Sequence, residues 1–310
     1  HIHKKTQPDI FIFTLPRTGS TLLAEILNTT KHSKSVLEPF NMNRQTRPII
    51  AKYIDDKVIS ERYFQLSNHQ LDCIKIYLED LSAGKLFNAY SWSDINTAYH
   101  SFKTENSIFK IHKISYYFDD IMNHFTSDYG LYLLRHPISH SLSRIRNNWS
   151  HYIKEFSTSE KIINQLTFNQ NKLITETLNS NDILSKFVLS WCLENFVFLN
   201  AQRNNTLNNN VIPIYYERII LNTKKTINEL YSFIQTKPNK AAFEIVNKPS
   251  KGVIHSSKET QKQILSKNKV YLIDRWQSQV SNTQLSNCQL ILDTFNITIY
   301  NTNQSLPILK

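Results

Sequence analysis

A short segment near the N-terminus, residues 16–21, combines one positive charge with three hydroxyl groups and one of the four glycines of the chain. After Pro16 it consists of Arg17, Thr18, Gly19, Ser20 and Thr21. The residues before it are typical of a buried strand, and those after it have helical spacing. Free N–H groups at a helix start attract anions, and glycine lets the backbone approach them closely. We expect a phosphate-binding turn, the alternative being an ordinary turn capped by Ser20 or Thr21.

The pattern of this turn is not that of the loop that binds ATP or GTP, G-x-x-x-x-G-K-[ST]. No lysine follows Gly19, and the positive charge stands before it, at Arg17. A second strand candidate, residues 130–134, ends in Arg135, where a nucleoside triphosphatase usually has a metal-binding aspartate. We therefore expect no metal site here, and an arginine fork suited to a further phosphate.

The segment that begins at Arg135 continues with Pro137, a residue suited to the first turn of a helix. Ser143 follows about two helical turns after Arg135, so the chain must fold back if both are to reach one ligand. A solvated arginine beside a polar helix face is the alternative for this segment taken alone.

Together, the two segments resemble the sulfotransferases that use 3′-phosphoadenosine 5′-phosphosulfate (PAPS). In that family a P-[KR]-[ST]-G-[ST]-[ST] loop binds the 5′-phosphosulfate, and an R-x-P-x-x-x-x-x-S segment binds the 3′-phosphate. Residues 16–21 match the first motif, and Arg135, Pro137 and Ser143 match the second. The resemblance implies PAPS as co-substrate and 3′-phosphoadenosine 5′-phosphate (PAP) as product, with no metal.

Two further segments resemble nucleotide-binding parts of the same family. Tyr216 belongs to a strand candidate that ends in Tyr-Glu, and the resemblance would place it near the adenine, although packing is the commoner role of such a tyrosine. Lys251 and Gly252 resemble the Lys-Gly loop that closes over the 3′-phosphate. The second glycine that the soluble animal enzymes have a few residues later is absent, and a basic surface loop is the alternative.

Sulfuryl transfer needs a base for the proton of the acceptor and cations for the leaving phosphate. Lys110 and His112 lie on one face of a strand candidate and resemble the Lys-x-His segment of cytosolic sulfotransferases, where the histidine is the base. Glu38, before a proline, resembles instead the Glu-Pro base of carbohydrate and tyrosyl-protein sulfotransferases. The sequence leaves both bases open. Arg17 replaces the usual lysine and would stabilise the departing phosphate as a permanent charge.

The composition indicates one domain over residues 1–310. The chain has 40% hydrophobic residues, and no Pro/Gly-rich linker divides it. Its charge, 36 basic minus 25 acidic residues or +11, favours anionic ligands, but the basic residues are scattered, so we expect no nucleic-acid partner. Three cysteines without metal or disulfide spacing favour the cytoplasm, and no apolar stretch predicts a membrane span.

Alternating strand and helix patterns predict an α/β fold with a central, mostly parallel sheet flanked by helices, similar to the P-loop-containing sulfotransferases. Arg17, His112 and Arg135 then fall at the carboxyl ends of strands. Asn181 and Asp182 could cap one long helix that runs to Leu199.

We therefore expect a PAPS-dependent sulfotransferase that acts on a hydroxyl or amine of a small-molecule acceptor. Residues 44–102 and 150–180 would build the acceptor pocket and contain no recognisable motif. Two alternatives remain, a P-loop kinase of small molecules and a non-catalytic module that binds anionic polymers.

Overall fold

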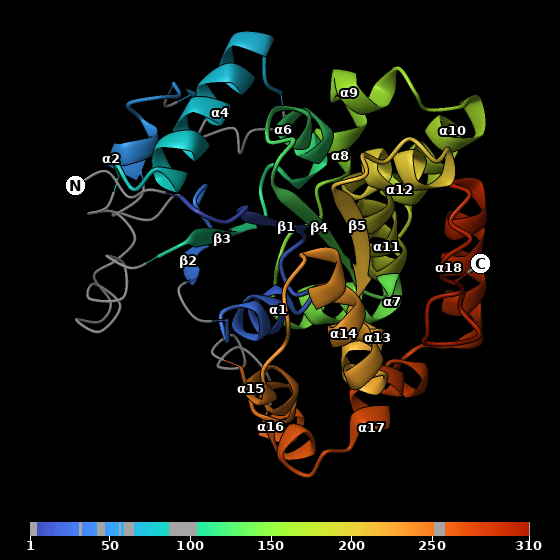
Figure 1. Cartoon of the computed structure of the whole chain (residues 1–310). Coiled ribbons are helices and arrows are strands. Elements are labelled where there is room, and N and C mark those ends of the chain that lie inside the picture. The colour runs from blue at the N-terminus through green and yellow to red at the C-terminus, as the bar shows by residue number, and fades with distance from the viewer. Residues whose placement is uncertain are drawn as a thin grey trace.

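The computed structural model describes residues 5–30, 33–41, 47–55, 57–58, 65–86, 104–250 and 258–309. Lys251 and Gly252, which the sequence analysis assigned to a phosphate-binding loop, lie outside the described residues. Strands and helices alternate along most of the chain (Figure 1).

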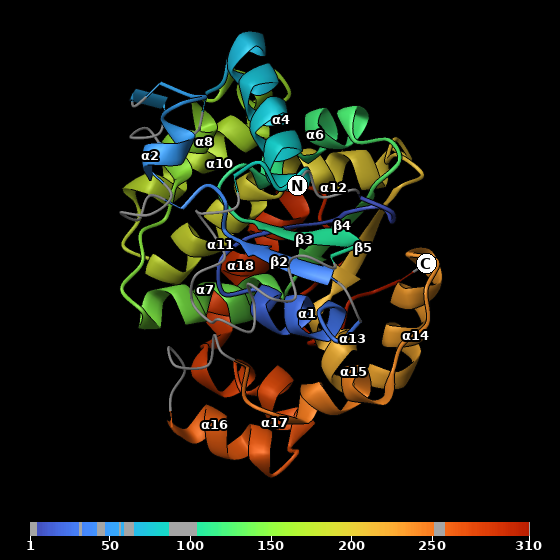
Figure 2. The ribbon, with the colours of Figure 1, turned by 60° about the vertical axis from the view of Figure 1, so that its left-hand side comes forward.

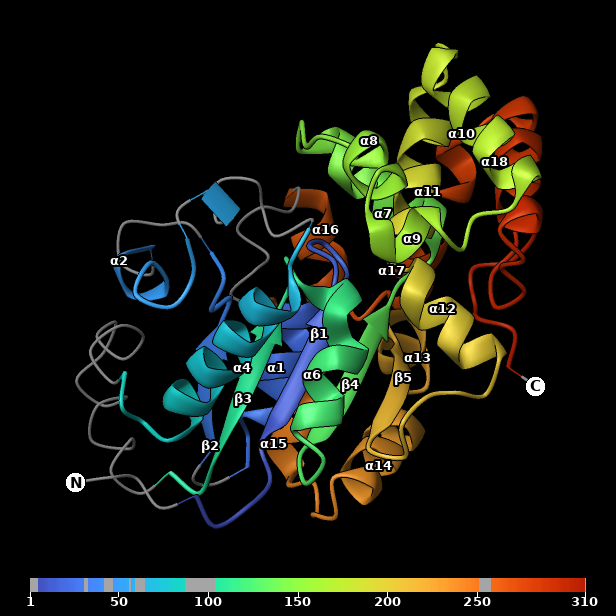
Figure 3. The ribbon, with the colours of Figure 1, turned by 90° about the horizontal axis from the view of Figure 1, so that it is seen from above.

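In the described residues, five strands form one parallel sheet in the order β2-β3-β1-β4-β5, which Figure 3 shows from above. The strands are β1 Ile10–Thr14, β2 Ser33–Leu37, β3 Asn106–Ile111, β4 Tyr129–Leu134 and β5 Val211–Tyr215. In the central register, Phe13 of β1 lies between Ile111 of β3 and Tyr132 of β4. The predicted α/β class with a mostly parallel sheet is confirmed.

The helices of the described residues are α1 Ser20–Leu27, α2 Arg47–Ile50, α4 Asn68–Ser82, α6 Phe118–His124, α7 Pro137–Arg146, α8 Ile153–Ser157, α9 Glu160–Ile163, α10 Phe168–Asn179, α11 Ile183–Glu194, α12 Phe196–Arg203, α13 Tyr216–Leu221, α14 Thr223–Phe233, α15 Lys240–Glu244, α16 Lys258–Leu265, α17 Lys269–Asp274 and α18 Asn282–Thr294. Short 3₁₀ turns are η2 Ser115–Tyr117, η3 Ile245–Asn247 and η5 Gln277–Gln279.

The sheet separates two hydrophobic cores because side chains alternate between its faces. Phe11 and Phe13 of β1 belong to the core under α4, α6 and α11, whereas Ile10 and Ile12 belong to the core under α1, α13 and α14. Figure 1 shows these two helical layers on opposite sides of the sheet. All five residues of β1 are buried, and each large apolar side chain buried in this way contributes about 1.5–3 kcal/mol. The central strand is therefore a rigid base for the turn that follows it.

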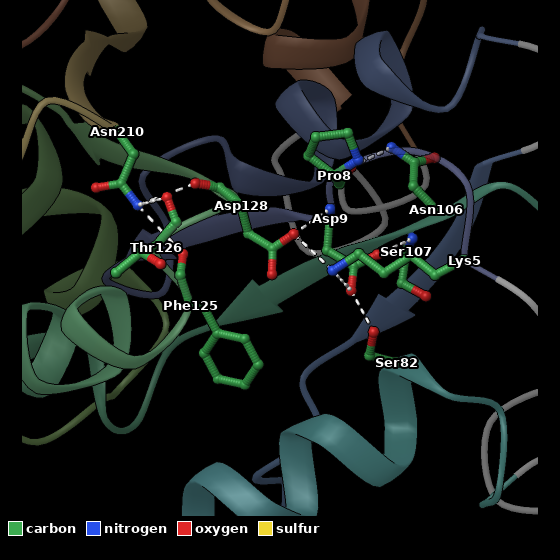
Figure 4. A network of polar contacts seen from close by, with 10 residues as sticks. All are labelled: Lys5, Pro8, Asp9, Ser82, Asn106, Ser107, Phe125, Thr126, Asp128 and Asn210. Carbon is green, nitrogen blue, oxygen red and sulfur yellow. Dashed lines mark hydrogen bonds and ion pairs between the residues drawn. The ribbon is translucent and has the colours of Figure 1, made fainter.

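Polar contacts around Asp9 join the strands at the end of the sheet where each begins (Figure 4). Asp9 N donates to Asp128 Oδ1 at 2.7 Å, and Asp9 Oδ1 accepts from Ser107 N at 2.6 Å. Lys5 Nζ lies 2.6 Å from Asp128 Oδ1. Asn210 Nδ2 donates to the Asp128 carbonyl at 3.0 Å. These contacts fix the starts of β1, β3, β4 and β5, and thereby the register that aligns their carboxyl ends.

The long helix predicted from Asp182 to Leu199 is two helices, α11 and α12, which meet at Asn195 and are bent by 60°. Asp182 caps α11 as predicted, with Oδ1 accepting from Ser185 N at 3.1 Å. At the break, the buried Asn195 side chain donates to the Trp191 carbonyl and accepts from the Tyr132 hydroxyl. No single helix of the described part of the chain is long and apolar enough to span a membrane, and only the bent pair of α11 and α12 meets that test jointly.

The carboxyl ends of the four strands β3, β1, β4 and β5 meet at one edge of the sheet, as the parallel pairing requires. Helix α1 follows β1 and α7 follows β4 at this edge. Helix α17 packs against α13, and η3 packs against α1. Figure 2 shows α16 and α17 below α1 and α7.

Candidate active site

A cavity of about 1150 Å³ lies at the carboxyl ends of the strands and is lined by residues of both predicted motifs. Of the residues singled out in the sequence, its lining includes Arg17, Gly19, Ser20, Thr21, Glu38, Lys110, His112, Arg135, Ser143 and Tyr216. Thr18 is buried behind the lining, where its hydroxyl donates to the Leu15 carbonyl. Lys248 and Ser250, which precede the undescribed residues Lys251 and Gly252, also line the cavity.

The turn after β1 needs a glycine at position 19 for two reasons. Gly19 is the N-cap of α1 and has a left-handed backbone, with φ 98°. A Cβ atom there would also lie 2.4 Å from Cδ2 of the Tyr216 ring, which is closer than any real contact. Arg17 has a left-handed backbone too, with φ 72°, a conformation that is strained for residues other than glycine. The turn therefore holds Arg17 in a strained backbone and packs Gly19 against an aromatic ring.

Arg135 connects the second motif to the first. Its Nη1 donates to the Arg17 carbonyl at 3.0 Å, and its Nη2 donates to Ser139 Oγ at 2.9 Å. The guanidinium carbon stands 4.7 Å from the centre of the Tyr216 ring, a cation–π contact. The buried Nε has no hydrogen-bond partner among the described residues. One donor of a fixed, buried guanidinium is thus left for a ligand.

Ser143 completes the contact between the motifs, because its Oγ accepts a hydrogen bond from Arg17 Nε at 3.3 Å. Pro137 occupies the first turn of α7, as predicted, so the helix starts directly after β4 and His136. Helix α7 then passes beside the turn after β1 and brings Ser143 back to it. The chain folds back as the shared-ligand hypothesis required.

Two arginines that sequence reasoning missed extend this positive region. Arg146 lies one helical turn after Ser143 on α7, and Arg275 follows α17; both line the cavity. Burial, with the charges of Arg135 and Arg146, lowers the pKa of Arg17 and lowers that of Arg275 to about 10. The spacing of three residues between Ser143 and Arg146 could have predicted that both side chains lie on the same face of the helix. Nothing in the sequence pointed to Arg275.

A second group of charged residues lies on the other side of the turn after β1. Lys110, at the end of β3, has its Nζ 2.9 Å from Glu38 Oε1 and 3.5 Å from Thr21 Oγ1. Glu38 N donates to the Lys110 carbonyl at 2.9 Å, and a left-handed backbone with φ 56° then turns the Glu38 side chain toward the cavity. Asn41 Nδ2 donates to Glu38 Oε2 at 3.2 Å. The two candidate bases thus share one site.

His112 contacts both the turn and the carboxylate. Its Nε2 lies 3.0 Å from Ser20 Oγ, and its Nδ1 lies 3.5 Å from Glu38 Oε1. Burial, with the charge of Lys110, lowers the pKa of His112 to about 4 although Glu38 opposes the shift. Burial would raise the pKa of Glu38, but the positive charges around it, foremost His112 when protonated and Lys110, hold it below its ordinary value. At neutral pH the site therefore contains a neutral imidazole and an ionised carboxylate.

Aromatic side chains form the wall of the cavity on the side of α8. The lining there includes Phe40, Tyr116, Trp149, Tyr152 and Phe156. Phe40, Tyr116 and Phe156 are also buried in the core, whereas Trp149 is 39% exposed. The cavity thus has a cationic part beside Arg135 and an aromatic part beside Glu38 and Tyr116. Among the described residues, no group of three or more His, Cys, Asp or Glu side chains could hold a metal ion.

Comparisons with known proteins identify the family of the chain. The chain is similar to three solved structures. The sulfotransferase domain from the curacin biosynthetic pathway has 14% identity and a TM-score of 0.47, and the match covers 94% of this chain and 99% of that chain. The sulfotransferase domain from the Synechococcus PCC 7002 olefin synthase has 15% identity and a TM-score of 0.43 (95% of this chain, 96% of that chain), and mouse sulfotransferase SULT7A1 complexed with PAP has 14% identity and a TM-score of 0.41 (94% of this chain, 85% of that chain). No curated protein sequence matches the chain. The model of the sulfotransferase family matches residues 8–238, which include the turn after β1, β3, Arg135 and Tyr216, and the chain therefore belongs to the sulfotransferase family.

Proposed function

We propose that this protein transfers a sulfuryl group from PAPS to a hydroxyl or amine of a small-molecule acceptor, and that residues 1–310 act as one sulfotransferase domain. The observation that carries the proposal is the direct contact between the two motifs. Arg135 binds the Arg17 carbonyl and Arg17 binds Ser143, across 118 and 126 positions of sequence. Both motifs line the cavity that also contains Lys110 and His112.

The residues present fit a nucleotide with a phosphate at each end. The N–H groups at the start of α1, with Arg17, Ser20 and Thr21, would hold the 5′-phosphosulfate. Arg135 and Ser143 would hold the 3′-phosphate, and the unpartnered Nε of Arg135 supports this assignment. The Tyr216 ring, packed on Gly19, would contact the adenine. Lys251 and Gly252 are proposed as the loop over the 3′-phosphate, by resemblance alone.

In the reaction, the acceptor oxygen or nitrogen attacks sulfur, and the bond from sulfur to the bridging phosphate oxygen breaks. The electron pair of that bond goes to the 5′-phosphate, which leaves as part of PAP. Lys110 and Arg17 offset the negative charge that develops on this group. The proton of the acceptor must go to a base as the new bond forms.

Within the proposal, His112 is the base and Glu38 orients it. Glu38 faces Nδ1, so the tautomer with the proton on Nδ1 is favoured and Nε2 is left to accept a proton. Nε2 points to Ser20 at the start of α1, where the sulfuryl group would lie. Glu38 is a weaker choice of base, since both of its carboxylate oxygens are engaged: Lys110 Nζ is 2.9 Å from Oε1, and Asn41 Nδ2 donates to Oε2. The aromatic part of the cavity would receive the body of the acceptor.

Calorimetric titration with PAP, and separately with ATP and magnesium, tests this function against its rivals. We expect PAP to bind without a metal ion and radiolabelled PAPS to lose its label to a compound from an acceptor panel. A small-molecule kinase would instead bind ATP only with magnesium. A module for anionic polymers would bind without preference for the 3′-phosphate, with an affinity that falls steeply with salt.

A further inference from the structure

The C-terminal helices α16 and α17 contribute one wall of the cavity although they lie beyond residue 238, where the family match ends. Thr260 and Ile264 of α16, Leu272 of α17 and Arg275 after it all belong to the lining. Figure 2 shows the two helices together below α1 and α7. This wall lies on the side of Tyr216, since α17 packs against α13, which begins with that tyrosine.

The position of Arg275 is fixed from two sides. Its Nη1 donates to Thr260 Oγ1 at 2.5 Å, which joins α17 to α16. The next residue, Trp276, is buried, and its ring stacks on His136 with 4.5 Å between ring centres. His136 directly follows Arg135 in the chain. The stacked pair therefore holds the backbone of Arg275 close to that of Arg135.

The arginines of this region repel one another. Among the described residues, no carboxylate forms an ion pair with Arg135, Arg146 or Arg275. Arg135 and Arg146 are near enough to Arg275 to repel its charge, and Arg135 is buried. The buried Glu217 carboxylate acts electrostatically on Arg135, but it is engaged by His136 N and the Tyr300 hydroxyl, and burial raises its pKa. An anion of high charge density in the cavity would offset the repulsion among the arginines.

We propose that Arg275 is a phosphate-binding residue that contacts, together with Arg135, the phosphate on the ribose 3′ position of the nucleotide. The assignment rests on the proposed function. Arg275 is close enough to Arg135 and Tyr216 for their charges to act on it, and the stack of Trp276 on His136 holds its backbone near that of Arg135. We therefore assign it to the end of the nucleotide that Arg135 would bind. Arg275 thus makes the site selective for 3′-phosphorylated adenosine nucleotides.

The test compares two ligands on three proteins. PAP and adenosine 5′-monophosphate, which lacks the 3′-phosphate, are titrated into the parent, Arg275→Gln and Arg203→Gln. Arg203 is an exposed arginine of α12 that donates to Asn200, so its variant changes the net charge equally outside the cavity. We expect Arg275→Gln to weaken PAP binding about 10- to 100-fold, as for other hydrogen bonds to a charged group, and to leave binding of the monophosphate unchanged.

A second variant, Thr260→Val, removes the hydroxyl that anchors Arg275, and we expect it to weaken PAP binding less than Arg275→Gln and with the same selectivity. Unchanged monophosphate binding shows in each case that the variant is folded. If Arg275→Gln weakens both ligands equally, or neither, the assignment to the 3′-phosphate is wrong while the proposed function stands. If the parent itself does not bind PAP, both the proposed function and this inference fail.

Discussion

Arg135 Nη1 donates a hydrogen bond to the backbone carbonyl of Arg17 at 3.0 Å, although 118 positions separate the two residues. The carbonyl belongs to a residue with a strained, left-handed backbone. Arg135 therefore stabilises the shape of the turn after β1, and under the proposed function its Nε would also bind the 3′-phosphate. The second motif positions the first, and neither side of the site is independent of the other.

Arg135→Ala should weaken PAP binding about 100-fold or more, because the charge-assisted contact to the ligand and the support of the turn after β1 are lost together. Arg135→Lys keeps the charge but cannot make the paired contacts to the Arg17 carbonyl and Ser139, so it should recover only part of the affinity. Calorimetric titration measures both, with Arg203→Ala as the control. Equal affinity in the parent and Arg135→Ala would remove Arg135 from the site.

The parallel sheet and the turn at residues 16–21 could be predicted from the sequence because local signals decide them. A buried strand, a glycine and a helix start stand next to one another in the chain, and Pro137 marks the start of α7 in the same way. Membership of the sulfotransferase family follows from these segments, and the family match confirms it.

The remainder of the site depends on contacts between distant segments. Arg275 is held at the cavity by contacts that include the stacking of its neighbour Trp276 on His136. These two rings are some 140 positions apart in the chain, so no local pattern predicts their contact. The break at Asn195 was missed for a related reason. Periodicity predicts a continuous helix, whereas the bend accompanies side-chain hydrogen bonds of Asn195 to Trp191 and Tyr132. The sequence also could not show that His112 and Glu38 lie in one site.

The roles of His112 and Glu38 predict different losses of turnover. We expect His112→Asn to lower kcat about 10²- to 10⁴-fold without changing PAP affinity, since a general base contributes in that range. Glu38→Gln should lower kcat less, about 10-fold, because the imidazole remains and only its orientation and the pairing with Lys110 are lost. Transfer of radiolabel from PAPS to an acceptor found in a panel measures both rates.

The opposite ranking, with Glu38→Gln slower than His112→Asn, would assign the base to Glu38 and leave His112 as its partner. Arg203→Gln again serves as the control, because the exposed arginine lies outside the cavity.

Gly19→Ala should both destabilise the protein and weaken PAP binding. The new Cβ would meet the Tyr216 ring at 2.4 Å and require a left-handed backbone, a combination that costs about 1–3 kcal/mol. Gly84→Ala is the matched control, because Gly84 also has a positive φ, of 71°, but follows α4 and does not line the cavity. Urea denaturation measures the stability of both variants. PAP titration should show a loss of affinity in Gly19→Ala and none in Gly84→Ala. A Gly19→Ala protein as stable as the parent would contradict the close packing against Tyr216.

The lowered pKa of His112 predicts that the protein loses stability on acidification. A variant without this histidine should lack that contribution. Burial, with the charge of Lys110, lowers this pKa from 6.5 to about 4 in the folded protein. Between these values the unfolded chain binds a proton at position 112 and the folded chain does not, so the free energy of unfolding falls as the pH falls. Integrated over the window, the contribution is about 3 kcal/mol. Asp9 and Glu217, whose pKa values burial raises, titrate in the opposite sense, so the parent alone would not isolate the effect.

The comparison of the parent with His112→Asn separates this effect from distant titrations such as those of Asp9 and Glu217, which are common to both proteins and cancel in the difference. The titration of Glu38 changes with its neighbour His112, but its pKa lies below the ordinary 4.5, so it affects the difference only at the acidic end of the window. Urea denaturation at several pH values between about 7.5 and 4 measures the free energy of unfolding of each protein. Relative to His112→Asn, the parent should lose stability as the pH falls below about 6.5, and the difference should level off near the folded pKa. A difference that stays constant across the range would mean that position 112 takes up a proton equally in both states, and the neutral imidazole required of the base would then be absent at mildly acidic pH.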